Sequence, residues 1–93
     1  MNFNIILTAD ALREEAESYL YYENQSDGLG DRFLTEIEFT LNKIASHPEH
    51  YSFCDTTKTI RDISLPNFPF VVIFELIQNG VIVFNIHHTK KNI

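Results

Sequence analysis

The spacing of apolar side chains predicts two consecutive helices in the first half of the chain. Residues 10–23 and 29–47 both repeat apolar positions at the spacing of an amphipathic helix. Thr8 is suited to cap the first helix, and Pro48 ends the second because the residue before a proline disfavours helical conformation. The expected core-facing stripes are Leu12, Ala16, Tyr19 and Leu20 in the first helix and Leu29, Phe33, Ile37, Leu41 and Ile44 in the second. Turn-forming residues 24–30 join them, so this half predicts a helical hairpin.

Strand-like patterns flank the hairpin on both sides. Apolar or alternating runs occupy residues 3–7, 57–65, 70–78 and 81–88, and the last two are rich in β-branched and aromatic side chains. Between those two lies Asn79-Gly80, a strong hairpin signal. The order strand, helix, helix and three strands predicts an α+β fold, β-α-α-β-β-β, in which the helical hairpin packs on a mostly antiparallel four-stranded sheet.

Asn79-Gly80 also predicts a register for the last two strands. If these residues form a two-residue loop, Gln78 faces Val81, and stepping outward places His88 opposite Val71. Because side chains alternate between the faces of a sheet, His87 and His88 should point to opposite sides. They could then act together on one substrate or metal only if a bulge intervened.

Charge is distributed unevenly along the chain. The net charge is −6, yet residues 1–47 hold nine acids and three bases, whereas residues 56–93 hold four bases and two acids. Such a chain is not a general nucleic-acid binder, which would need a broad basic surface. Its length of 93 residues and 44% hydrophobic content favour one domain spanning 1–93. The single cysteine, and the absence of a signal-like or membrane-length apolar run, lead us to expect a soluble cytoplasmic protein with no membrane partner.

Candidate chemistry is concentrated in the last third of the chain. Arg61 could hold a phosphate or an acidic partner, or it could simply pair with a neighbouring carboxylate. His88 could be a general acid or base, since an unperturbed imidazole has a pKa of about 6.5, or it could be a half-buried residue at the end of a strand. Lys90 and Lys91 could bind a partner or merely add solubility.

No cofactor or metal is predicted. The four histidines, His47, His50, His87 and His88, lack paired cysteines and the helical His-x-x-x-His spacing of common metal sites. Gly28-Leu29-Gly30 does not follow a strand, so it is not a phosphate-binding loop.

Six short motifs, taken in order, resemble those of a known family. They are Tyr19–Glu23, Gly28–Leu34, Ile44–Pro48, Arg61, Phe68-Pro69-Phe70 and His88–Lys91. Their order and spacing look like the RelE/ParE toxin superfamily of bacterial type II toxin–antitoxin systems, often labelled plasmid stabilisation proteins, and are closest to its ParE-like branch. Two positions depart from the family pattern: Phe70 stands where a tyrosine is usual, and Lys91 stands where an arginine is usual.

The resemblance implies a toxin that a cognate antitoxin neutralises. ParE-like relatives are associated with inhibiting DNA gyrase by binding, so a non-enzymatic inhibitor is the leading hypothesis. A RelE-type mRNA endonuclease acting on the ribosome is the alternative, with Arg61, His88 and Lys91 as catalytic candidates. It would need a denser set of bases, and lysine lacks the planar fork of arginine. The third hypothesis is a detoxified family member that acts only as an interaction module. The predicted partner-binding residues are Arg61, Phe70, His88, Lys90 and Lys91, with Arg61, His88 and Lys91 at one rim.

Overall fold

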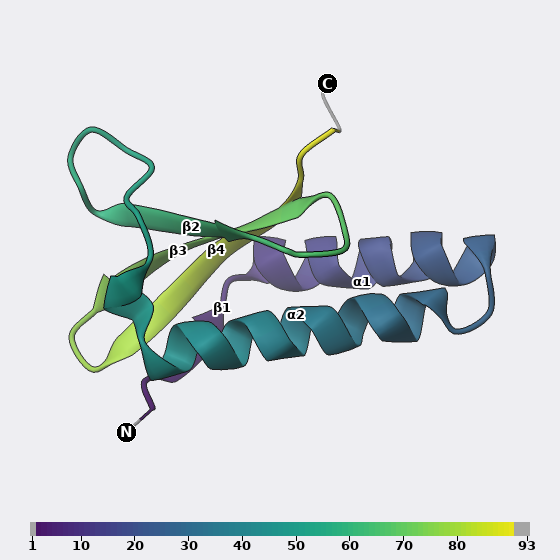
Figure 1. The fold of residues 1–93 in the computed structure, drawn as a ribbon, viewed down its shortest axis with the longest axis horizontal. Helices are drawn as coiled ribbons and strands as arrows, with labels where there is room; N and C mark the ends of the chain where they lie inside the picture. Colours follow the sequence, from purple (N-terminus) through teal and green to yellow (C-terminus); the bar gives the residue numbers. More distant parts are fainter. Residues whose placement is uncertain (1, 91–93) are drawn as a thin grey trace.

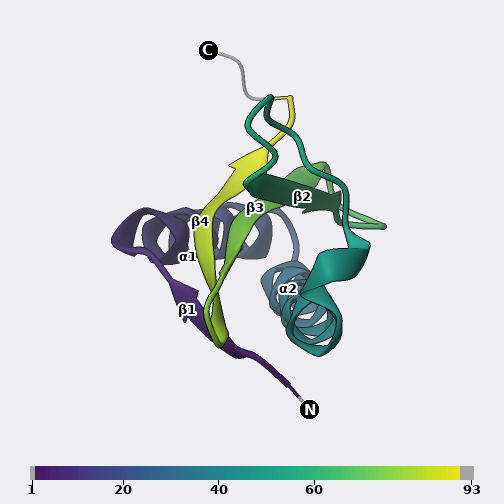
Figure 2. The same ribbon diagram turned by 90° about the vertical axis from the view of Figure 1, so that its left-hand side faces the viewer.

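The computed structural model describes residues 2–90 and confirms the predicted order of elements. Two helices follow a short first strand, and three strands complete the chain (Figure 1). The elements are β1 (Asn4–Leu7), α1 (Ala9–Gln25), α2 (Leu29–Ser46), the short 3₁₀ helix η1 (Pro48–His50), β2 (Ile60–Ser64), β3 (Phe70–Ile77) and β4 (Gly80–His88). The helices run side by side in opposite directions on one side of the twisted sheet, which Figure 2 shows from the end. This is the predicted α+β arrangement.

The sheet order is β1-β4-β3-β2. β1 pairs in parallel with β4, and the other neighbours are antiparallel. Antiparallel strands can be joined by tight turns, whereas the parallel pair needs a long connection, which here runs through both helices and then β2 and β3. The first and last strands of the fold therefore lie next to each other.

The predicted hairpin register is wrong. Ile77 pairs with Gly80, so Gln78 and Asn79 form the turn, and Asn79 adopts the left-handed conformation that asparagine tolerates. Gly80 instead opens β4, opposite Asn4 of β1, where a Cβ would lie 3.4 Å from the Asn4 carbonyl oxygen. Gly80 therefore pairs with β1 as a strand residue, and the turn forms one residue earlier than its sequence signal suggests.

A bulge in β4 shifts the register a second time. Phe74 pairs with Val83 but Ile73 pairs with Asn85, which leaves Phe84 as the extra residue. His88 consequently lies opposite Phe70 rather than Val71. His87 is exposed and His88 is half-buried, so the two histidines still point to different faces, as expected.

The core lies between the sheet and the helices. Its fully buried members are Ala11 of α1, Phe33, Ile37 and Ile44 of α2, and Val72, Phe74, Val81, Val83 and Ile86 of β3 and β4. At one end of this core the rings of Phe33 and Phe70 lie 4.9 Å apart, with Tyr22 and Phe68 packed around them. The predicted stripe of α2 therefore faces the core.

Most of the predicted stripe of α1 does not, although Tyr19 is half-buried against Gly30 of α2. Leu12 is 53% exposed and Leu20 is 58% exposed, and Ala16 is also exposed. The inner face instead carries Ala11 and Tyr22, with polar residues between them. Leu12 follows Ala11 by one position, or about 100° of helix rotation, so the apolar side of α1 is turned away from the sheet.

Candidate functional site

Helix α1 begins beside the edge of β4, at the point where the pairing with β1 ends. The Thr8 backbone N–H donates to the Val83 carbonyl at 3.0 Å, and the Thr8 hydroxyl donates to the Phe84 carbonyl at 2.8 Å. The same hydroxyl accepts from the Ala11 N–H at 3.1 Å, so Thr8 also caps the helix, as predicted. One side chain thus fixes both the start of α1 and the path of β4.

Glu14 continues this contact one turn along. Its carboxylate accepts from the Ile86 backbone N–H at 2.8 Å and from the Asn85 side-chain amide at 3.2 Å. Ile86 lies beyond the β1 pairing, so its N–H would otherwise lack a strand partner on that side. The inner face of α1 is polar here because it accepts hydrogen bonds from the edge of a strand and does not pack on an apolar surface.

An open groove of about 330 Å³ lies between α1 and the end of β4. Glu14, Glu17 and Tyr21 line it from α1, and Phe70, His87 and His88 line it from the sheet. The carboxylates of Glu14 and Glu17, the phenol of Tyr21 and the imidazole of His88 give the groove a polar, acidic wall. It is suited to receive a basic side chain of a partner.

His88 is held at the mouth of this groove. Its ring meets the Phe70 ring edge-on at 4.9 Å, and its Nδ1 accepts from the Lys90 backbone N–H at 3.0 Å. Thr89 donates to the Pro69 carbonyl through both its N–H and its hydroxyl. These contacts fold the end of β4 back onto the Phe-Pro-Phe segment, and they leave the other ring nitrogen of His88 as the one able to meet a partner.

Phe70 and the two lysines stand in different settings. Phe70 is only 3% exposed, so its ring serves the core and forms the floor of the groove. Lys90 is exposed beside His88. Lys91, the remaining predicted site residue, lies outside the described residues.

Arg61 is engaged with its own loop. Its Nη1 donates to the carbonyls of Tyr51 at 2.7 Å and Glu49 at 3.2 Å, and the guanidinium lies 4.0 Å from the centre of the Phe53 ring. Within residues 2–90 its Nε is buried without a hydrogen-bond partner. The expected carboxylate partner is thus replaced by main-chain oxygens and an aromatic face, and the side chain clamps the loop before β2.

A tight turn around Asp55 lies in that loop. The Asp55 carboxylate accepts from the Thr57 hydroxyl and from the backbone N–H groups of Thr59 and Ile60. These hydrogen bonds, the Thr57 hydroxyl foremost, hold the pKa of Asp55 well below its ordinary value. The turn delivers the chain into β2 one residue before Arg61.

Arg61 and His88 do not share a rim. Arg61 lies opposite Phe74 and His88 lies opposite Phe70, so four residues of β3 separate their positions. At the rise of an antiparallel strand this is about 13 Å. The prediction that these groups gather at one rim is wrong for Arg61, because β2 runs antiparallel to β3, so that its early residue Arg61 pairs with Phe74 while only its end reaches the start of β3.

The sequence matches, over residues 5–93, the family described as ParE toxin of type II toxin-antitoxin system, parDE. The chain belongs to the ParE toxin family. A solved structure described as "Chromosomal ParDE TA system from P. aeruginosa" superimposes with a TM-score of 0.80 at 13% identity, covering 95% of this chain and 97% of that chain. At that identity the likeness supports the shared fold. No curated protein sequence matches.

Family membership makes this chain a ParE-type toxin and implies an antitoxin partner. Neither helix within residues 2–90 has the length and apolar character needed to cross a bilayer. Sequence reasoning missed Glu14 and Tyr21 as groove residues. Their positions on α1 gave no signal, because the groove exists only once the helix is docked on the bulged end of β4.

Proposed function

We propose that this ParE-family toxin inhibits DNA gyrase by binding it, and that a cognate antitoxin neutralises it by covering α1 and the end of β4. The choice of gyrase follows what the resemblance to the ParE-like branch implies. The structure bears on how such binding would occur.

The observation that carries the proposal is the outward apolar face of α1. Leu12, Leu20 and Tyr21 are all more than half exposed, at 53%, 58% and 58%. Large apolar side chains exposed on one helix of a small protein are candidates for a surface that binds another protein. Tyr21 also lines the acidic groove, and Leu20 precedes it on the helix, whereas Leu12 lies on the side of α1 away from the groove. The antitoxin segment that fits them is an amphipathic one carrying basic residues beside its apolar side chains.

The same geometry argues against a nuclease. An RNA-cleaving site needs cations and an acid–base pair aimed at one phosphate. Arg61 is bound to main-chain oxygens and lies about four residues of β3 from His88, while Phe70 has no hydroxyl and is buried. We therefore assign His88 and Lys90, together with Lys91, to partner binding at the rim, with Phe70 supporting His88 from below and Arg61 positioning its loop.

Controlled expression without the antitoxin tests the proposal. Growth, plasmid supercoiling and transcript integrity are scored on the same cultures, and the purified toxin is added to a gyrase supercoiling assay. We expect growth arrest, loss of gyrase supercoiling and intact transcripts. Cleaved transcripts with normal supercoiling would point instead to the RelE-type endonuclease. Normal growth at high expression would indicate a detoxified family member.

The antitoxin surface has its own test. A double variant, Leu12→Ala with Leu20→Ala, should weaken antitoxin binding at least tenfold while leaving the unfolding transition nearly unchanged, since both side chains are exposed. Phe39→Ala is the matched control, because Phe39 is 60% exposed but lies on α2. Equal losses for the control and the double variant would remove α1 as the docking face.

A further inference from the structure

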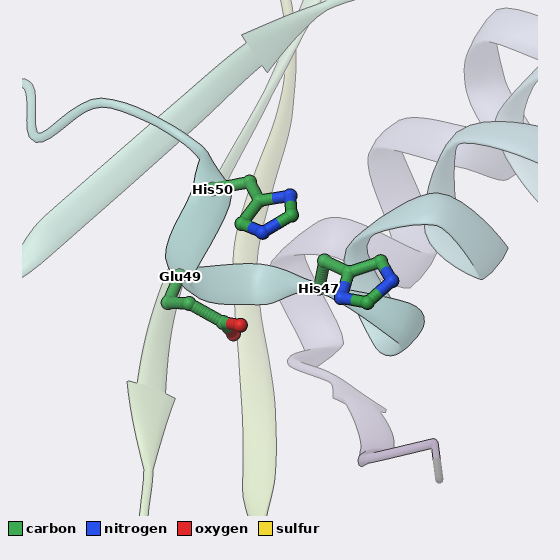
Figure 3. Close-up of side chains that lie close together, drawn as sticks. All are labelled: His47, Glu49 and His50. Atoms are coloured by element: carbon green, nitrogen blue, oxygen red, sulfur yellow. The ribbon is translucent and has the colours of Figure 1, made fainter.

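Three side chains with metal-binding chemistry meet where α2 ends and η1 begins. His47, Glu49 and His50 are all exposed, and one possible ligand atom from each lies within 4.8 Å of the others (Figure 3). The imidazole rings of His47 and His50 are stacked, with centres 4.6 Å apart and planes 7° from parallel. This cluster lies outside the groove and outside the α1 surface.

The local backbone explains why these side chains meet. A 3₁₀ helix has three residues per turn, so side chains at positions i and i+3 eclipse each other. His47 is the cap residue shared by α2 and η1, and the His50 N–H donates to the His47 carbonyl at 3.1 Å. Pro48 is buried between them and fixes the turn. Sequence reasoning found no metal site because it looked for α-helical His-x-x-x-His spacing, whereas a 3₁₀ turn aligns His-x-x-His.

We propose that His47, Glu49 and His50 bind a first-row divalent cation, with Zn²⁺ as the representative ion. Two imidazoles and one carboxylate form a donor set that suits Zn²⁺, Co²⁺ and Ni²⁺. The site also lies at the C-terminal end of α2, where the helix dipole favours positive charge.

Nearby cations do not compete for the cluster. Lys43 extends over the Phe39 ring, 5.6 Å from its centre. Arg61 contacts the main-chain oxygen of Glu49, and its guanidinium stacks on Phe53. The carboxylate of Glu49 is therefore left to face the two imidazoles.

Binding requires only side-chain rotation. Ligand atoms around a tetrahedral Zn²⁺ ion lie about 3.3 Å apart, given Zn–N distances of about 2.0–2.1 Å. All three side chains are exposed and free to close that gap, while the backbone stays pinned by Pro48. Three ligands leave one coordination position open on the surface, which water or a residue from a binding partner can fill.

Metal titration of the untagged full-length chain tests this site. Zn²⁺ is followed by calorimetry and Co²⁺ by visible absorption, with His47→Ala, Glu49→Gln and His50→Ala as variants and His87→Ala as the matched exposed-histidine control. We expect saturable binding of one ion per chain, a tetrahedral Co²⁺ spectrum, and affinity at least tenfold weaker in each ligand variant but unchanged in the control.

A spectroscopic measurement separates metal ligation from a fold defect. His47 caps two helices, so its variant is compared with His50→Ala by circular dichroism in EDTA, and the imidazole ¹⁵N shifts of the unaltered chain are recorded with and without Zn²⁺. The proposal predicts that the shifts of His47 and His50 move and those of His87 do not. Equal Zn²⁺ affinity in the His50→Ala variant, or unmoved His47 and His50 shifts at saturation, would overturn it.

Discussion

The two helices carry similar apolar patterns, yet they use them in opposite ways. α2 turns Phe33, Ile37 and Ile44 into the core, whereas α1 turns Leu12 and Leu20 outward. The inner side of α1 instead presents Glu14 to the edge of β4. A periodic pattern therefore predicts that a helix forms. Which side of that helix is buried depends on the surface against which the helix packs. Where the apolar side remains outside, it is available to a partner.

The largest expected effect tests this difference between the two helices directly. Phe33→Ala should lower the free energy of unfolding by about 3–5 kcal/mol, because a buried ring leaves a cavity. Leu20→Ala should change it by less than about 0.5 kcal/mol, since an exposed side chain loses few contacts. Urea unfolding followed by circular dichroism measures both. If the two variants lost similar stability, the outward orientation of Leu20 would be incorrect.

The polar inner side of α1 gives the next largest effect. Glu14→Ala removes the acceptor of the Ile86 N–H and should cost about 1–3 kcal/mol, the usual cost of an unsatisfied buried donor. Glu17→Ala, one turn further from β1 and exposed, is the control. Hydrogen exchange should show faster exchange of the Ile86 amide in the Glu14 variant alone. Unaltered protection of that amide would contradict the role assigned to Glu14.

A smaller effect is expected at the opposite edge of the sheet. Arg61→Ala removes two hydrogen bonds to carbonyls and the stack on Phe53, at a cost of about 1 kcal/mol for partly solvated contacts. The loop that contains Tyr51 should become more sensitive to limited proteolysis. Lys58→Ala, exposed in the same loop region, is the control and should behave as the unaltered chain does.

The smallest effect concerns acid stability. Because the folded-state pKa of Asp55 is depressed, its contribution is present above the unfolded pKa of about 3.9 and is lost as pH falls through the folded value. Asp55→Asn should therefore be less stable than the unaltered chain at neutral pH, and the difference should shrink below about pH 4. Urea midpoints measured across that range test the sign. A difference that grew on acidification would contradict it.

Much of the fold could be predicted from the pattern of residues, and the failures have local causes. Helix and strand positions depend on neighbours along the chain, such as Pro48 after α2, so they can be predicted from the sequence. The register of β4 depends on Gly80 meeting β1 and on the bulge at Phe84, which are contacts between distant segments. For the same reason the site was only partly predicted. His88 was recognised at a strand end, whereas Glu14 acquires its role only through β4.

The pairing of β1 with β4 has a consequence for the order of synthesis. A ribosome makes β1 first, and Thr8 must wait for Phe84, 76 residues later, to complete its hydrogen bond. Until residues 80–83 emerge, β1 has no strand to pair with, and the edge that Glu14 seals does not yet exist. A nascent chain therefore completes its sheet only after β4 has been made, and the groove between α1 and β4 forms only then.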